Sequence, residues 1–321
     1  MPCEWALQVV EIVYYIQIMR KFIFIAFFSL ALSLGLLSCG LHSLFADDLS
    51  DSRIVEALQE ALFLGSQTAA ENLSTPCSNS GGGCATGYLG NTRKIDALGN
   101  TLEIVLPDTI KNVLGFVGKV DGFPSPVKSA ITSVTNISSF QGYADDIKKT
   151  LNRGAEQAAK EAVPLFRDAI FGMSFSDARS ILFGNDNTAA TSYLKNATFP
   201  HLKELFGGKL TAMLNNLNLN AFCAPLVKGY NSVATVYNPM QSSATYNSLP
   251  KLPYDNLPSN LSERLSDYAT GRALDGLFYM VGVQEANLRA DPWGAVKAVG
   301  GFITDTVGDL LVDVFSKAKE G

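Results

Sequence analysis

Apolar residues recur at intervals of three and four along most of the chain. The spacing is clear at residues 54–69 and 143–170, and it returns at 261–291. Such recurrence gathers apolar side chains on one side of an α-helix. No segment alternates with the period of two that a half-buried strand requires. We therefore predict an all-α fold, a single multi-helix bundle domain of roughly eight to ten helices.

Prolines, glycines and capping residues divide this pattern into separate helices. Capping residues and a proline at the first helical position mark helix starts, and glycine marks an end. Ser50 begins the first helix, and Pro164 kinks or restarts the long pattern at 143–170. The other predicted starts are Pro107, Ser174 or Ser176 (with a stop at Gly184), Asp186 or Asn187, Pro200, Ala221, Leu261 and Pro292.

Residues 235–260 interrupt the helical pattern. Pro239, Pro250, Pro253 and Pro258 stand there among serine, asparagine and tyrosine, and no period survives. A structureless stretch of this length inside a compact domain is usually functional or disordered. We predict a proline-rich loop over these residues.

Residues 19–38 have the features of a signal peptide. Arg20 and Lys21 follow Met19, and residues 22–37 then carry no charge. An uncharged stretch of 16 residues suits the apolar region of a signal peptide. It is shorter than the roughly 20 residues that span a bilayer. The leader is therefore predicted to direct export.

The leader ends in a motif that predicts lipid attachment. Leu36-Leu37-Ser38-Cys39-Gly40 resembles the lipobox of bacterial lipoproteins, with leucine at −3 and a small residue before the cysteine. In that class the cysteine thiol receives a diacylglyceryl group. We predict lipidation of Cys39, with a plain secretory signal or an uncleaved anchor as the alternative. Two or three acyl chains would hold the protein firmly on a membrane.

A short tether joins this anchor to the helical domain. Residues 39–49 reach at most roughly 35 Å when fully extended, and the domain then covers residues 50–321. Residues 1–18 contain two glutamates and no lysine or arginine, which is atypical of the basic start of a signal peptide. We interpret Met19 as the true start and residues 1–18 as a spurious extension.

Composition limits the choice of partners. Apolar residues make up 47% of the sequence, enough for a large core, and the formal net charge is −5. No basic run follows the leader. A mildly acidic chain argues against nucleic acid as a partner and against electrostatic docking on a membrane.

Two cysteines flank a glycine-rich loop. Cys77 and Cys84 enclose Ser-Asn-Ser-Gly-Gly-Gly, which is flexible enough to bring the two sulfurs together. In an oxidising envelope we expect a disulfide, which would stabilise the fold by roughly 2–3 kcal/mol. A metal pair is the weaker alternative, since no histidine or third cysteine lies nearby. Cys223 stands among apolar residues and is interpreted as a buried, inert thiol.

Few residues suggest catalysis. The chain has two histidines, His42 and His201, and a zinc site needs three or four ligands. No glycine-rich phosphate loop and no Gly-x-Ser-x-Gly motif occurs. Nucleophile, base and orienting group cannot be assembled from the remaining residue types. We expect no metal, no cofactor and no enzymatic activity.

Charges inside otherwise apolar helices form the best candidate site. Arg153 and Glu156 lie three residues apart, as do Arg272 and Asp275. The simple interpretation is polar contact on helix surfaces or between helices, worth a few tenths of a kcal/mol per pair. The sharper hypothesis is that these four residues meet across two helices around a ligand.

Several motifs resemble the bacterial domain-of-unknown-function family 4197 in order and spacing. They include Asn152-Arg153-x-x-Glu156 and lie at 151–159, 166–173, 177–193, 268–278 and 288–292. The resemblance extends from about residue 50 to residue 316. It implies a secreted or lipid-anchored helical envelope protein and carries no assigned activity or catalytic residues. The Cys77–Cys84 segment and residues 235–260 depart from it as elaborations, and residues 279–285 are less acidic than is usual there.

The sequence predicts a role in structure or binding at the bacterial cell envelope. The protein would face the periplasm from the inner or outer membrane through lipid on Cys39, with an envelope protein as its partner. A carrier of an apolar ligand or lipid within the bundle, covered by residues 235–260, is an alternative. An enzyme of an unrecognised type is the third.

Overall fold

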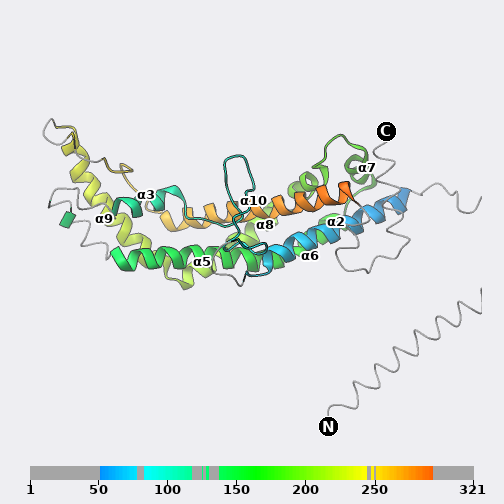
Figure 1. Ribbon diagram of the computed structural model, residues 1–321, viewed down its shortest axis with the longest axis horizontal. Coiled ribbons are helices and arrows are strands. Elements are labelled where there is room, and N and C mark those ends of the chain that lie inside the picture. Colours follow the sequence, from blue (N-terminus) through cyan, green and yellow to red (C-terminus); the bar gives the residue numbers. More distant parts are fainter. Residues whose placement is uncertain are drawn as a thin grey trace, which may run out of the picture. The chain divides into compact units, whose positions relative to one another are not determined.

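The computed structural model describes residues 51–77, 83–117, 125, 128–129, 137–243, 247–248 and 251–291 (Figure 1). Its helices are α2 (Asp51–Ser74), α3 (Asp108–Val117), α5 (Ile137–Glu161), α6 (Val163–Phe171), α7 (Phe175–Phe183), α8 (Ala189–Asn216), α9 (Leu219–Gln241) and α10 (Leu261–Ala290). Within these described ranges there is no β-strand, and one isolated bridge joins Lys94 to Thr101. The prediction of an all-α fold is confirmed.

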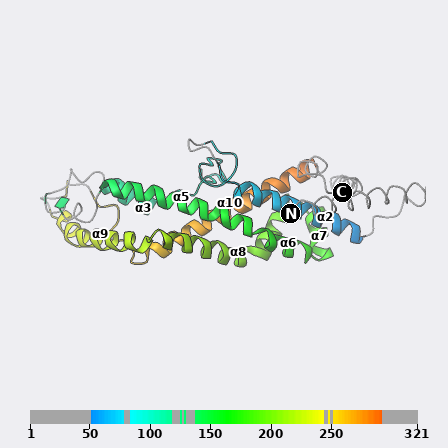
Figure 2. The ribbon, with the colours of Figure 1, turned by 90° about the horizontal axis from the view of Figure 1, so that it is seen from below.

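Helix α10 lies at the centre of the packing. It contacts α2, α5, α8 and α9, and α5 and α8 lie alongside it in both views (Figures 1 and 2). A helix surrounded in this way must be apolar on more than one side. Its buried residues accordingly include Leu265, Ala269, Ala273, Leu274, Leu277, Phe278 and Val281.

Helix α8 runs through Pro200, which was expected to open a new helix. The prediction of two separate helices here is wrong. Every fourth residue of α8 is buried on both sides of the proline: Ala190, Leu194, Thr198, Leu202, Phe206, Leu210 and Leu214. Pro200 itself is exposed. Burial of this continuous row offsets the hydrogen bond that proline removes.

Local signals do determine the short helices between α5 and α8. Pro164 lies in the first turn of α6, so it restarts the helix after α5 ends at Glu161. Ser174 caps α7, and its side chain and that of Asp177 exchange hydrogen bonds with each other's backbone N–H. This is a capping box. Gly184 follows the last residue of α7, as predicted.

Helix α9 extends further than the sequence suggested. It continues to Gln241 and holds Pro239 in its last turn, so residues 235–241 of the predicted loop are helical. After Gln241, the described residues up to the start of α10 are outside helices. The predicted loop therefore begins seven residues too early, because proline near a helix end leaves most of the hydrogen bonds intact.

The predicted anchor lies outside the described residues. This applies to the extension 1–18, the signal peptide 19–38, the tether 39–49 with Cys39, and the last helix predicted from Pro292. Of the helices that the structure describes, none is long and apolar enough to cross a membrane.

Candidate functional site

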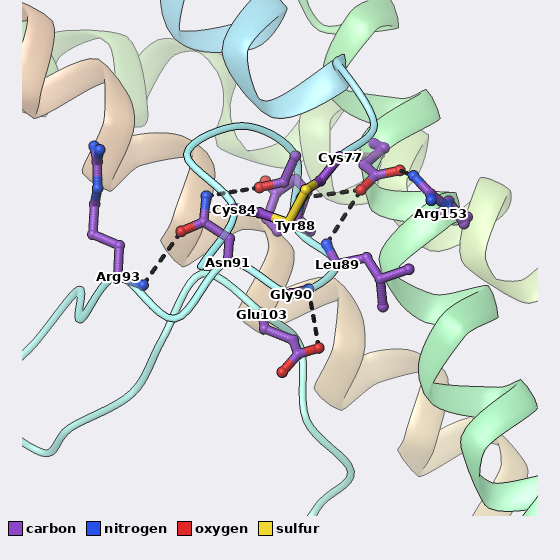
Figure 3. Close-up of a disulfide and its surroundings, with 11 residues drawn as sticks. Cys77, Cys84, Tyr88, Leu89, Gly90, Asn91, Arg93, Glu103 and Arg153 are labelled. Atoms are coloured by element: carbon purple, nitrogen blue, oxygen red, sulfur yellow. Dashed lines mark hydrogen bonds and ion pairs between the residues drawn. A yellow bond between two sulfur atoms is a disulfide. The ribbon is translucent and has the colours of Figure 1, made fainter. Parts of the chain in front are cut away.

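Glu156 binds an arginine and two backbone N–H groups at once. It lies on α5 with 2% of its surface exposed. Arg153, one turn earlier, places Nη1 2.6 Å from Oε2. Oε1 accepts hydrogen bonds from the N–H groups of Tyr88 and Leu89, at 3.1 and 3.2 Å (Figure 3). These partners supply the charge and hydrogen bonds that a buried carboxylate requires.

Tyr88 belongs to an irregular segment, residues 84–106, that we call the strap. In the chain the strap lies between α2 and α3, and its side chains and backbone form hydrogen bonds with both α5 and α10. While the N–H of Tyr88 binds Glu156 of α5, its hydroxyl donates to the carbonyl of Ala273 on α10 at 2.7 Å. The whole Tyr88 side chain is buried. Tyr88 therefore connects two helices that are more than a hundred residues apart in the chain.

Two glycines make room for this arrangement. Gly87 has a φ of +72°, and a Cβ there would lie 2.8 Å from Oε1 of Glu156. On the other side, a Cβ on Gly276 would lie 2.9 Å from the ring of Tyr88. Both distances are too short for any side chain, so glycine is required at each position.

Arg272, which forms an ion pair with Asp275 on α10, binds a later part of the strap. Their Nη1 and Oδ2 atoms are 3.5 Å apart, and Asp275 is more than half exposed. Nη2 of Arg272 donates to the carbonyl of Thr101 at 3.2 Å. Arg272 of α10 thus binds the strap at Thr101, whereas Glu156 of α5 binds it at Tyr88 and Leu89.

The four predicted site residues flank the protein's own chain. Among the described residues, ion pairs join Arg153 to Glu156 and Arg272 to Asp275, and none joins one pair to the other. Tyr88 contacts both helices between the pairs. The strap therefore lies where the sharper hypothesis expected a ligand.

Asn152 provides a third anchor for the strap. Its fully buried side chain accepts the N–H of Ile104 at 2.8 Å and donates to the carbonyl of the same residue at 2.9 Å. It also donates to the carbonyl of Lys148 on its own helix. The amide thus pairs with both backbone polar groups of Ile104, as a residue of a neighbouring strand would.

A disulfide fixes the beginning of the strap. Cys77 and Cys84 are bonded, with Cα atoms 5.9 Å apart (Figure 3). The N–H of Cys84 donates to the carbonyl of Gly90, and the N–H of Gly87 donates to that of Asn72 in α2. The bond therefore restricts the chain between the end of α2 and the residues that bind Glu156.

A second buried carboxylate, Glu285 of α10, holds the start of α8. It is 5% exposed and accepts the N–H groups of Ala190 and Thr191, at 3.1 and 2.8 Å, and the Thr191 hydroxyl at 2.7 Å. Arg289 places Nη2 2.7 Å from Glu285 and also donates to the carbonyl of Ile181 in α7. Glu285 supplies the cap that α8 lacks locally, since the side chain of its N-cap residue Thr188 makes no capping hydrogen bond.

A surface cleft lies where the beginnings of α3 and α10 meet the proline-rich segment. Its volume is about 490 Å³, a size typical of sites for small molecules. Two tyrosines, two prolines and two leucines form most of the lining, and one arginine and one aspartate add charge. These residues are Tyr254, Tyr268, Pro107, Pro258, Leu261, Leu265, Arg264 and Asp267.

Helix α9 fixes one wall of this cleft. The Tyr230 hydroxyl accepts the N–H of Tyr254 at 2.9 Å and donates to its carbonyl at 2.8 Å. Asn231 makes the same pair of contacts with Leu257, at 2.7 and 2.9 Å. Asn112 of α3 donates to the Tyr254 hydroxyl. The proline-rich segment is therefore held in place beside the cleft.

A comparison of the sequence with protein families identifies the family of this chain. The sequence model of the family described as protein of unknown function (DUF4197) matches residues 117–299, more than half of the chain. The chain belongs to the DUF4197 family. No curated protein and no solved structure gives a significant match.

The DUF4197 match is narrower than the span of 50–316 that the motifs suggested. It contains the strap's anchors, such as Asn152, Glu156 and Arg272, but not the strap itself. Both ends of the Glu285 contact lie within it. The cleft is divided, because Pro107 and Thr109 precede the match and residues 254–268 lie inside it.

Burial raises the pKa values of several tyrosines and of one cysteine in this DUF4197 protein. Burial first, and then Glu156 and Asp275, raise the pKa of Tyr88 well above 10.0. Burial raises the pKa of Tyr230 to about 12 and that of the Cys223 thiol to about 11. The tyrosines are therefore hydrogen-bond donors at neutral pH, and the thiol is protonated and unreactive.

Metal ligands do not gather in the part of the chain that the structure describes. No three His, Cys, Asp or Glu side chains there are placed to share an ion. His201 is exposed on α8, and His42 lies outside the described residues.

Sequence reasoning missed Tyr88, Glu285 and the cleft. No spacing marks Tyr88, because its partners lie 68 and 185 residues away. A glutamate inside the apolar run of α10 was the available signal for Glu285. The tyrosines of the proline-rich segment were the available signal for the cleft.

Proposed function

We propose that this DUF4197 protein is a lipid-anchored binding protein of the bacterial cell envelope. The lipobox at Cys39, which follows a basic and apolar leader, supports the anchor. A cysteine at this place in a leader has one common chemical use, acylation of its thiol. The tether then keeps the helical domain close to the membrane surface.

The α3–α10 cleft is the proposed binding site, and it is the observation that carries the binding role. Its prolines, leucines and tyrosine rings suit an apolar or aromatic group, while Arg264 and Asp267 suit a polar end. We therefore expect a small amphipathic ligand, or one apolar side chain of an envelope protein. At about 490 Å³ the cleft is too small for a whole membrane lipid.

The ligand of this proposal binds at the surface of the bundle. Between α2, α8 and α10 the free volume is about 10 Å³, in a space lined by residues such as Leu62, Leu194 and Leu288. On the same measure, a cavity needs roughly 10–15 Å³ to hold one water molecule. If the protein is a carrier, we therefore propose that its ligand binds in the cleft and not in this part of the interior.

Lipid labelling tests the anchor. The chain from Met19 onward, expressed in a bacterial host, should incorporate radiolabelled fatty acid and stay in the membrane fraction. Cys39→Ala should lose the label, while Cys223→Ala, as a matched control, should keep it. Equal labelling of Cys39→Ala and the parent protein would refute the anchor.

Native mass spectrometry tests the cleft. Gently purified protein should retain a small molecule, and Tyr268→Ala should weaken that binding about tenfold. Tyr279→Ala is the matched control, since Tyr279 lies on the same helix outside the cleft lining. Equal retention by the two variants, or no retained molecule in the parent protein, would count against the cleft.

A further inference from the structure

Exposed phenylalanines gather on α6 and α7. In the part of the chain that the structure describes, five large apolar side chains are exposed, and three of them belong to these two short helices. Phe171, Phe175 and Phe183 are 46%, 39% and 47% exposed. Single exposed apolar residues are normal, but three large exposed rings within thirteen residues are unusual for a surface in water.

Helix α7 combines these rings with a positive charge. Phe175, Arg179 and Phe183 follow one another at four-residue intervals, so they share a side of the helix. The guanidinium of Arg179 lies 5.6 Å from the ring centre of Phe183. The buried residues of α7 are Ala178, Ile181 and Leu182. Phenylalanine together with basic residues is typical of helices that lie at the lipid headgroup level.

These helices lie against the part of α2 where the described chain begins. The rings of Phe63 and Phe171 are 5.8 Å apart, and Gln59 donates to the carbonyl of Ile170. Phe63 is twelve residues from Asp51, or roughly 18 Å along the helix. Helix α7 also packs on α2, at the end where α2 begins (Figure 1). The phenylalanines are therefore close to the point where the tether joins the domain.

Chain length brings the proposed lipid within reach of this surface. Asp51 is the twelfth residue after Cys39, so the two are at most about 40 Å apart. We infer that Phe171, Phe175 and Phe183 enter the headgroup region of the membrane that holds Cys39, with Arg179 beside a lipid phosphate. This inference rests on the proposed anchor. It adds an orientation, in which α6 and α7 face the lipid.

Fluorescence quenching by brominated lipid tests the orientation. The probe is Phe183→Trp in the full chain, with Trp5 and Trp293 changed to phenylalanine, in phosphatidylcholine vesicles. This variant should lose about half its tryptophan emission to lipids brominated near the headgroup and be shielded from aqueous iodide. Leu98→Trp in the same background is the control, because Leu98 is 89% exposed but lies on the strap. The control should respond to iodide and not to the brominated lipid.

Each other outcome overturns the inference. Quenching of the Phe183→Trp variant by iodide alone would show a surface in water. Shielding of its tryptophan from both quenchers would show that protein covers this surface, either a second copy or residues 292–321. Equal lipid quenching of the Phe183→Trp and Leu98→Trp variants would show no preferred face. The mass of the same preparation reports lipid on Cys39, so loss of the anchor and loss of the orientation are distinguished.

Discussion

Glu156 and Glu285 are two buried carboxylates that each bind a segment distant in the chain. Each is a buried carboxylate with an arginine one turn away on its own helix and two backbone N–H groups from a distant segment. Glu156 binds the irregular strap, whereas Glu285 binds the first residues of a long helix. The strap lies outside the DUF4197 match and α8 lies inside it.

This difference separates a local role from a global one. Helix α8 contacts α5, α6 and α10, so disturbing its start affects the core shared by all of them. The strap is held by a few side chains and a disulfide, and only some of its residues, such as Tyr88, enter that core. Loss of Glu285 should therefore destabilise the whole domain, and loss of Glu156 should release one segment.

Glu285→Ala should cause the largest loss of stability. The N–H groups of Ala190 and Thr191 would lose their acceptor, and Arg289 would keep a largely buried charge without its partner. We expect the free energy of unfolding to fall by about 4 kcal/mol, measured by urea denaturation. Glu285→Gln keeps an acceptor and should lose about half as much. A loss below that of Glu156→Ala would contradict the proposed division.

Glu156→Ala should cost less, about 3 kcal/mol. It also leaves two backbone N–H groups unpaired, but the Arg153 side chain is 29% exposed and water can solvate its charge. The same urea experiment measures the change. Spectroscopic helix content should stay at the parent value, and a clear loss of helix would indicate that Glu156 supports the bundle itself.

Removing the disulfide should weaken the strap by a similar route. The double variant Cys77→Ser with Cys84→Ser removes a restriction on the unfolded chain. The free energy of unfolding should therefore fall by about 2 kcal/mol. Reductant should lower the stability of the parent protein by the same amount and leave the double variant unchanged. An effect of reductant on the double variant would point to another thiol.

Tyr88→Phe should give the smallest change at neutral pH, about 1 kcal/mol for one hydrogen bond. Because the pKa of Tyr88 is raised above 10.0, the folded state keeps a proton that the unfolded chain loses. The Tyr88 hydroxyl therefore makes its full contribution to the free energy of unfolding below pH 10, and this contribution falls as the pH rises above that value. Urea denaturation at several alkaline pH values should therefore show a shallower decline for Tyr88→Phe. If the stability of Tyr88→Phe declines at alkaline pH as steeply as that of the parent protein, the decline is due to other tyrosines.

Local sequence signals explain the helices but not the strap. The Ser174 cap, Gly184 and Pro164 act within one turn, so they could be located from the sequence. Pro200 was misjudged because a long buried row of α8 overrides a local signal. Asn152 and Glu156 were recognised as unusual, but their partners are backbone groups 48 to 68 residues away. Periodicity carries no information on such contacts.

The candidate cleft shows the same limit. Residues 235–260 were identified as special because the helical period is lost there. The cleft itself depends on Pro107 and on Tyr268, which belong to other segments. Only the fold brings these three parts together.

Amide hydrogen exchange tests most directly whether Glu156 acts as the anchor of the strap. We expect Glu156→Gln to speed exchange at the N–H groups of Tyr88 and Leu89 at least tenfold, while Ala190 and Thr191 keep the parent rates. Glu285→Gln should speed exchange in α8 and in the domain as a whole. Unchanged protection of Tyr88 and Leu89 in Glu156→Gln would contradict the central claim.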